Sequence, residues 1–130
     1  MKDLVADLLA YAKENNIGLD ELSAFMDDLK CSLTDQMLEE GEEYVIKRSG
    51  SLQKFDQEKI GRSVERAAKA IDQNLNKSDT NLIISDLKNE TEKLDRKVYT
   101  TAEIRKIVGD CLVKEGYKEV ADSYLKNRVY

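Results

Sequence analysis

The stretch YVIKRSGSLQKFDQEKI, residues 44–60, decides how the larger part of this chain folds. Helical spacing gives way here to two short runs, residues 44–48 and residues 51–55, which contain β-branched, aromatic and aliphatic residues and predict two short strands. The Ser-Gly pair at 49–50 suits the turn between them, so the strands form a hairpin. Asp56 follows immediately, and its side chain suits the N-cap of a helix. The stretch therefore predicts a hairpin that leads directly into a helix.

The residues that follow extend this pattern to the C-terminus. Helical spacing of apolar residues continues to about residue 74, and Ser78 or Asp79 can cap a second helix. Residues 97–100 are β-branched and aromatic, which predicts a third strand, and Thr101 can cap a third helix with a fourth behind it. The predicted order is ββααβαα. We therefore expect an α+β fold in which a small three-stranded sheet caps a four-helix bundle.

The chain in front of the hairpin has a different character. Apolar residues at helical spacing predict one helix over residues 2–15 and a second stripe over residues 19–29, separated by a stop at Gly18. A third short helix is expected from Thr34 to about Gly41. We therefore divide the chain into a short helical N-terminal segment, residues 1–43, and a compact domain, residues 44–130. Helices this short have to pack on each other, on the compact domain or on a partner.

The net charge of −5 is unevenly divided between these two regions. Residues 1–43 hold three basic and twelve acidic residues, a net charge of −9, whereas residues 44–130 hold eighteen basic and fourteen acidic residues, a net charge of +4. The acidic region repels polyanions and the basic region attracts them, which is typical of two functional regions. A simpler alternative is that residues 1–43 are an acidic helical appendage.

Residue types that are missing exclude several classes of protein. The chain has no His and only two Cys, Cys31 and Cys111, which are far apart and which we expect to be buried free thiols. These counts exclude a zinc ribbon and a Ser-His-Asp triad, and no GxxxxGK[ST] or GxGxxG motif occurs. We therefore expect no enzyme, no catalytic residues and no metal site. The lack of a long apolar run or a signal sequence predicts a cytoplasmic protein with no membrane partner.

Three cations gather around the predicted hairpin. Lys47 and Arg48 lie at the end of its first strand, and Lys59 falls in the first turn of the following helix, where a cation opposes the helix dipole at a cost of about 0.3–1 kcal/mol. An anion bound at the helix N-terminus would explain this placement. The alternative is that these side chains are solvated and protect a short edge strand from pairing with other chains.

Several motifs in this region resemble those of a known family. They are V-x-K-R-x-G at residues 45–50, F-D-x-x-K-I at residues 55–60, the helix start at residues 101–104 and the ending Val120-Ala121…Tyr124…Arg128. Together with the order ββααβαα, they make residues 44–130 resemble the ATP-cone domain. That domain is the nucleotide-binding regulatory module of ribonucleotide reductases and of their bacterial transcriptional repressor. Ser49 departs from the family, which usually has an acidic residue in this turn.

The resemblance implies a site for ATP or dATP, which bind as effectors with or without Mg²⁺. Val45 would line the adenine pocket, and three cations would hold the phosphates: Lys47, Arg48 and Lys59. Further positions implied to contact the nucleotide are Gln53, Asp56, Thr101, Arg105, Tyr124 and Arg128.

The resemblance also implies a function. We expect a non-enzymatic, allosteric adenine-nucleotide sensor that regulates a partner or its own oligomeric state and is linked to ribonucleotide reductase and deoxynucleotide metabolism. A homo-oligomer, most simply a dimer, and a ribonucleotide reductase subunit are the expected partners. The alternative is a nucleotide-responsive transcriptional regulator that binds DNA. DNA is the less favoured partner, because the repressor binds DNA through a zinc ribbon that this chain lacks.

Overall fold

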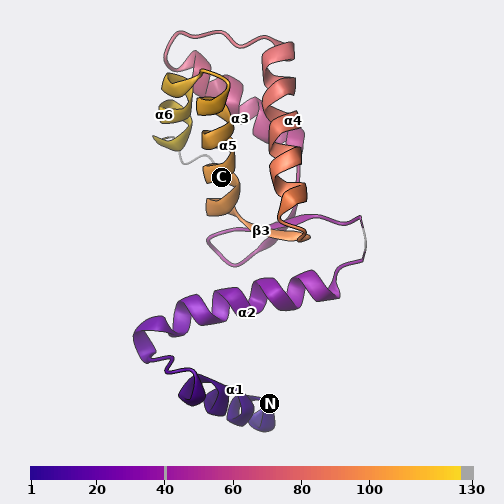
Figure 1. Ribbon diagram of the computed structural model, residues 1–130, viewed down its shortest axis with the longest axis vertical. Coiled ribbons are helices and arrows are strands. Elements are labelled where there is room, and N and C mark those ends of the chain that lie inside the picture. Colours follow the sequence, from indigo (N-terminus) through magenta and orange to yellow (C-terminus); the bar gives the residue numbers. More distant parts are fainter. Residues whose placement is uncertain (40, 127–130) are drawn as a thin grey trace. The chain divides into compact units, whose positions relative to one another are not determined.

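A computed structural model describes residues 1–39 and 41–126, and the chain divides into two compact units, Met1–Met37 and Leu38–Tyr130 (Figure 1). Each unit is described by itself below. Arg128, one of the expected site residues, lies outside the described residues.

The first unit is a pair of helices. Helix α1 spans Lys2–Glu14, a short 3-10 helix spans Leu19–Glu21, and helix α2 spans Leu22–Met37. The prediction of a separate helix from Thr34 was wrong, because α2 continues through this position. The Thr34 hydroxyl donates to the carbonyl oxygen of Lys30, 2.7 Å away and one turn back, instead of capping a new helix.

The sheet of the second unit has three short strands. Strand β1 spans Tyr44–Ile46, β2 spans Leu52–Lys54 and β3 spans Val98–Thr100. The central strand β1 is antiparallel to β2 and parallel to β3. The predicted hairpin is confirmed, but its strands are shorter than expected because the turn begins at Lys47, whose carbonyl accepts from the Gly50 amide at 2.8 Å. Gly50 has φ +87°, a left-handed conformation that glycine adopts without strain.

Four helices complete the second unit. Helix α3 spans Gln57–Lys69, α4 spans Lys77–Lys93, α5 spans Thr101–Lys114 and α6 spans Lys118–Lys126. The order ββααβαα is confirmed. Helix α3 is shorter than the predicted helix to residue 74, and Asp72, which has φ +57°, lies just beyond its end.

The helix caps confirm one prediction and correct two. Asp56 caps α3 as predicted, since its Oδ1 accepts from the backbone N–H groups of Glu58 and Lys59 at 3.0 and 3.3 Å. Helix α4 is capped by Asn76, and Asp79 returns a bond to the Asn76 backbone in a reciprocal capping box. Thr100, not the predicted Thr101, caps α5 in the same way, because its side chain accepts from the backbone of the residue three positions on.

The core of the second unit lies between its helices. Helix α3 packs against α4 and α6, and α5 packs against the same two helices. Their inward side chains are fully or almost fully buried, among them Val64, Ile83, Leu87, Ile104, Val108, Leu112 and Val120. None of the described helices has the length and apolar character needed to cross a membrane.

The two cysteines differ in their surroundings. Cys111 is buried in this core, and burial is the largest cause that raises the pKa of its thiol to about 11. Cys31 is only partly buried, which corrects the expectation that both thiols are buried. The elevated pKa keeps Cys111 protonated at neutral pH, so its thiol is not activated as a nucleophile.

Candidate functional site

Two pockets lie where the hairpin meets the N-terminal ends of α3 and α5. The first, the hairpin pocket, has a volume of about 30 Å³. Its lining is Val45, Lys47, Gln53, Lys54, Phe55, Asp56, Lys59, Ile60, Thr101 and Ile104. The second, the cation pocket, has a volume of about 550 Å³. Its lining is Lys47, Arg48, Thr101, Ala102, Arg105, Lys106, Asp110 and Leu125.

Lys47 and Thr101 line both pockets, so the two form one connected region of the molecule. The Thr101 hydroxyl donates to the carbonyl oxygen of Ile46 at 3.0 Å, which ties the first residue of α5 to the end of β1. This bond fixes the helix start beside the strand that carries Lys47. The boundary between the pockets is therefore built by one strand end and one helix start.

The hairpin pocket combines an apolar wall with the N-terminus of α3. Val45, Ile60 and Ile104 provide aliphatic surface, and Phe55 is held by the tilted ring of Tyr99, 6.0 Å away between centroids. Lys59 lies in the first turn of α3, as the sequence predicts. The pocket thus offers an apolar surface next to three cations, Lys47, Lys54 and Lys59, which favour an anion, while the Asp56 carboxylate caps the N-terminus of α3.

The cation pocket is strongly positive. Four basic side chains and one acidic side chain, Asp110, line it. Within the described residues, none of the four basic side chains forms an ion pair. The Arg105 guanidinium donates a hydrogen bond to the backbone carbonyl of Leu125, at the end of α6. The remaining donors of these cations are available for a polyanion.

The structure brings together most, but not all, of the expected site residues. Eight of them line one pocket or both: Val45, Lys47, Arg48, Gln53, Asp56, Lys59, Thr101 and Arg105. Tyr124 instead lies in the core, where its side chain is only 3% exposed. The carboxylate of Asp56 is already occupied as the cap of α3.

Sequence reasoning missed two cations of this region. One is Lys54, which lines the hairpin pocket, and the other is Lys106. It lines the cation pocket one helical turn beyond Ala102 and directly after Arg105. The signal was available, since residues four positions apart on a helix share a face. Extending the face of α5 by one turn from Ala102 would have found it.

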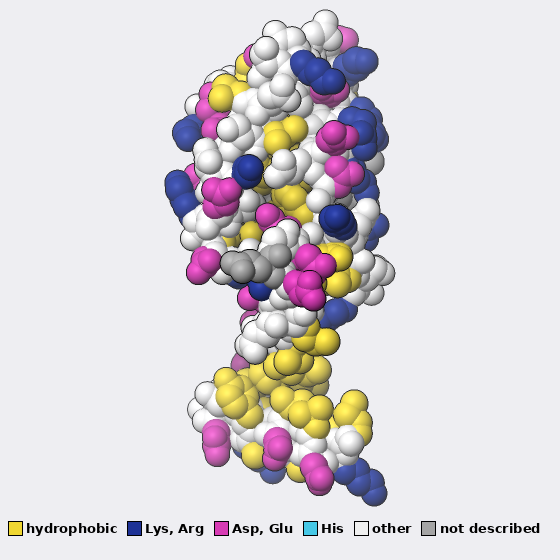
Figure 2. Space-filling view, turned by 90° about the vertical axis from the view of Figure 1, so that its right-hand side faces the viewer, with side chains coloured by type: hydrophobic (Ala, Val, Ile, Leu, Met, Phe, Trp, Pro, Cys, Tyr) yellow, Lys and Arg dark blue, Asp and Glu magenta, His cyan; other side chains and the backbone are white. Residues whose placement is uncertain are grey.

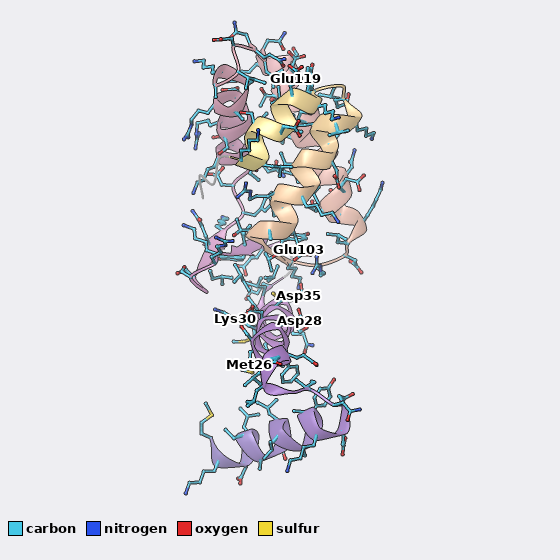
Figure 3. The ribbon with its side chains drawn as sticks, turned by 90° about the vertical axis from the view of Figure 1, so that its left-hand side faces the viewer. Met26, Asp28, Lys30, Asp35, Glu103 and Glu119 are labelled. Carbon is cyan, nitrogen blue, oxygen red and sulfur yellow. The ribbon has the colours of Figure 1, made fainter. Side chains whose placement is uncertain are left out.

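The start of α5 is fixed by a second set of bonds. Glu103 accepts hydrogen bonds from Arg96 and from the backbone and hydroxyl of Thr100. Burial alone would raise the pKa of the Glu103 carboxyl, but these hydrogen bonds and the charge of Arg96 outweigh burial and lower it. Figure 3 shows Glu103 at the end of α5 that adjoins the sheet. The bonds hold the helix start, and with it Thr101, in place.

An apolar pocket beside a cluster of cations, both built at the ends of strands and helices, is typical of a small domain that binds an anionic ligand with an apolar part. A family model described as the ATP cone domain matches residues 43–129. The chain belongs to the ATP-cone family. The ATP cone is a regulatory module that binds nucleotide effectors and is not catalytic. No curated protein matches this chain.

Proposed function

We propose that this protein is a non-enzymatic sensor of ATP or dATP. The observation that carries the proposal is that the apolar hairpin pocket and the cation pocket share Lys47 and Thr101. A nucleotide is the kind of ligand that matches this pair, because it joins an apolar base to a charged phosphate chain.

In this proposal the adenine lies against Val45 in the hairpin pocket, with the Gln53 amide at its edge. Lys47, Arg48 and Lys59 hold the phosphates, and Mg²⁺ arrives bound to the triphosphate. Arg105 borders the sugar and phosphates from α5. Each charged contact to phosphate contributes roughly 1.5–3 kcal/mol.

Other expected site residues contribute by holding the helices and strands of the site in place. Asp56 acts by fixing the N-terminus of α3, and Thr101 by fixing α5 to β1. Tyr124 acts from the core, where it sets the position of α6, and Arg128 remains a proposed contact.

The hairpin pocket is much smaller than the roughly 300–1,000 Å³ of typical ligand sites. Binding of the base therefore requires the hairpin to move away from the starts of α3 and α5. Such a movement couples ligand binding to the shape of the domain. In this proposal the four helices form a bundle and the sheet caps it. Coupling of this kind is what an allosteric module needs.

We propose that the domain works in the cytoplasm, consistent with its free thiols, and passes the nucleotide signal to a ribonucleotide reductase subunit or to its own assembly. A second candidate, a DNA-binding regulator, is favoured by the net charge of +4 over residues 44–130. Retention on duplex DNA at physiological salt would support this second candidate, because nonspecific electrostatic binding weakens steeply with salt.

The test is calorimetric titration of ATP, dATP and GTP into the full chain and its variants. We expect Lys47→Ala and Lys59→Ala each to weaken ATP or dATP binding by about tenfold or more. The matched control is Lys88→Ala on the exposed surface of α4, which should bind like the parent. Equal affinity for GTP would contradict the adenine preference. Unchanged affinity in both site variants would contradict the phosphate site.

A further inference from the structure

The first unit, residues 1–37, has no buried residue. Ten of its large apolar side chains are between 42 and 92% exposed: Met1, Leu4, Val5, Leu9, Tyr11, Leu19, Leu22, Met26, Leu33 and Met37. The one aromatic contact inside the unit stacks Tyr11 of α1 on Phe25 of α2 at 5.7 Å. Figure 2 shows these hydrophobic side chains gathered over α1 and α2.

A unit of this size does not hold itself together. Chains below about 40 residues usually need disulfides, a metal or oligomerisation to be stable. This unit has a single cysteine, Cys31, and no group of His, Cys, Asp or Glu among its residues, all of which are described, could hold a metal. Another protein surface has to cover its apolar faces.

Charge and spacing on α2 point to a second copy of the same helix as that surface. Leu22, Met26, Leu29 and Leu33 follow one another at steps of four, three and four residues, which is the spacing of a helix-pairing seam. By helical spacing, the carboxylates of α2, at Asp27, Asp28 and Asp35, lie on the sides of the helix away from this seam. Figure 3 labels two of them, Asp28 and Asp35, together with Met26 of the seam. Two copies could therefore pair along the seam without placing carboxylates against each other, although the unit is acidic.

The described part of the compact domain has fewer exposed large apolar residues than the first unit. They are spread along the chain over one strand, the helices and their ends: Leu52, Ile71, Leu82, Leu94, Val113 and Leu125. Single exposed apolar residues of this kind are normal and do not mark an interface. A stable interface needs about 800 Å² from each partner, so the exposed apolar side chains of α1 have to be covered together with the stripe of α2.

We infer that residues 1–37 form a two-fold dimerisation unit, in which the Leu22-Met26-Leu29-Leu33 stripe of α2 packs against the same stripe of a second chain and α1 covers the pair. This inference names the assembly surface that the proposed function leaves open, but it does not depend on nucleotide binding. A two-fold contact of one patch with itself is the commonest form of homo-oligomer.

The first test is the molar mass of the full chain by sedimentation equilibrium over a hundredfold range of concentration. We expect a mass that approaches twice 14.8 kDa. The double variant Met26→Glu and Leu33→Glu should stay at the mass of one chain, with at least a hundredfold weaker association. Ala24→Glu adds one carboxylate on the opposite side of α2 and should associate within about threefold of the parent, whereas Met26→Glu alone should weaken association.

A second test keeps the inference open to refutation if the double variant loses helix structure. In a Cys31→Ser background, Leu29→Cys should form a covalent dimer with a short bismaleimide, whereas Ala24→Cys should not. A parent chain that remains a monomer would overturn the inference, as would cross-linking that is equal at the two positions. Calorimetry with ATP on the same variants separates the two proposals, since the double variant should still bind nucleotide.

Discussion

Thr101 illustrates how one hydroxyl group serves both the fold and the site. The sequence suggested it as a helix cap, but Thr100 takes that role and the Thr101 hydroxyl donates to Ile46 instead. The hydroxyl and the lysine at the end of β1 then share the boundary between the two pockets. Thr101, which the sequence predicted as a site residue, lines both pockets, and its hydroxyl ties α5 to β1 instead of capping the helix.

Replacing Thr101 with Val should expose this role. The substitution keeps the shape but leaves the Ile46 carbonyl without its donor, which should lower the free energy of unfolding by about 1–2 kcal/mol. Affinity for ATP should fall several-fold, because α5 is no longer fixed to β1. Urea unfolding and calorimetry measure the two effects. Thr101→Ser retains the hydroxyl and should restore both, and failure of this rescue would contradict the role of the bond.

Lys106 is one of the two cations that sequence reasoning missed, and it provides a second test at the scale of a residue. Lys106→Ala should weaken ATP binding about three- to tenfold and reduce the dependence of affinity on salt, because one positive charge leaves the cation pocket. Lys114→Ala, two turns further along α5 and outside both pockets that hold the expected site residues, is the control. Equal effects of the two substitutions would show that only overall charge matters.

At the scale of elements, the sequence predicted what local patterns determine. The hairpin, the order of strands and helices and the Asp56 cap follow from short runs of strand-forming residues, helical spacing and one side chain, and all are confirmed. Choices between neighbouring residues of similar chemistry were less predictable. Thr100 and Thr101 suit an N-cap equally well, and the bond from Glu103 decides between them.

The same limit applies to longer-range contacts. Tyr124 was placed in the site by its motif, but its side chain packs in the core because α6 lies against α3 and α5. Thr34 matched a helix start, but its hydroxyl bonds back along a helix that was already formed. The helices that surround Tyr124 are far from it along the chain, so a short pattern does not reveal them. The partner of Thr34 is only one turn back, but threonine suits both a cap and this bond, so the residue type alone does not decide.

The capping box of α5 makes a pH prediction. The pKa of Glu103 is lowered in the folded protein, so between its folded and unfolded values the folded state binds fewer protons. The free energy of unfolding therefore rises with pH through this range, and the contribution is complete above 4.5 and lost as the pH falls below it. Glu103→Gln should remove this part of the pH dependence.

Urea unfolding between pH 3 and pH 7 measures this effect. The difference in stability between the parent and Glu103→Gln should be largest at pH 7 and shrink at acid pH. Glu92→Gln, which removes an exposed carboxylate of α4, is the matched control for the loss of one negative charge. A constant difference at all pH values would show that the carboxyl acts only through packing.

At the scale of the molecule, the division into two units separates binding from assembly. Every buried residue among those described belongs to the second unit, so this unit contains the core that it needs. Deleting residues 1–37 should leave the affinity for ATP within about twofold and the midpoint of thermal unfolding nearly unchanged, while association of chains is lost. Calorimetry, thermal unfolding and light scattering check the three outcomes. A deletion variant that cannot bind ATP would show that the first unit contributes to the site.

The small volume of the hairpin pocket also affects the rate at which a ligand binds. A ligand that has to wait for the hairpin to open binds at a rate limited by that opening, so the observed rate should level off as the ATP concentration rises. Stopped-flow measurements would show a plateau instead of a straight line. Under the proposed function, opening that is slow compared with swings in nucleotide concentration would make the protein respond to the average level of nucleotide and ignore brief pulses.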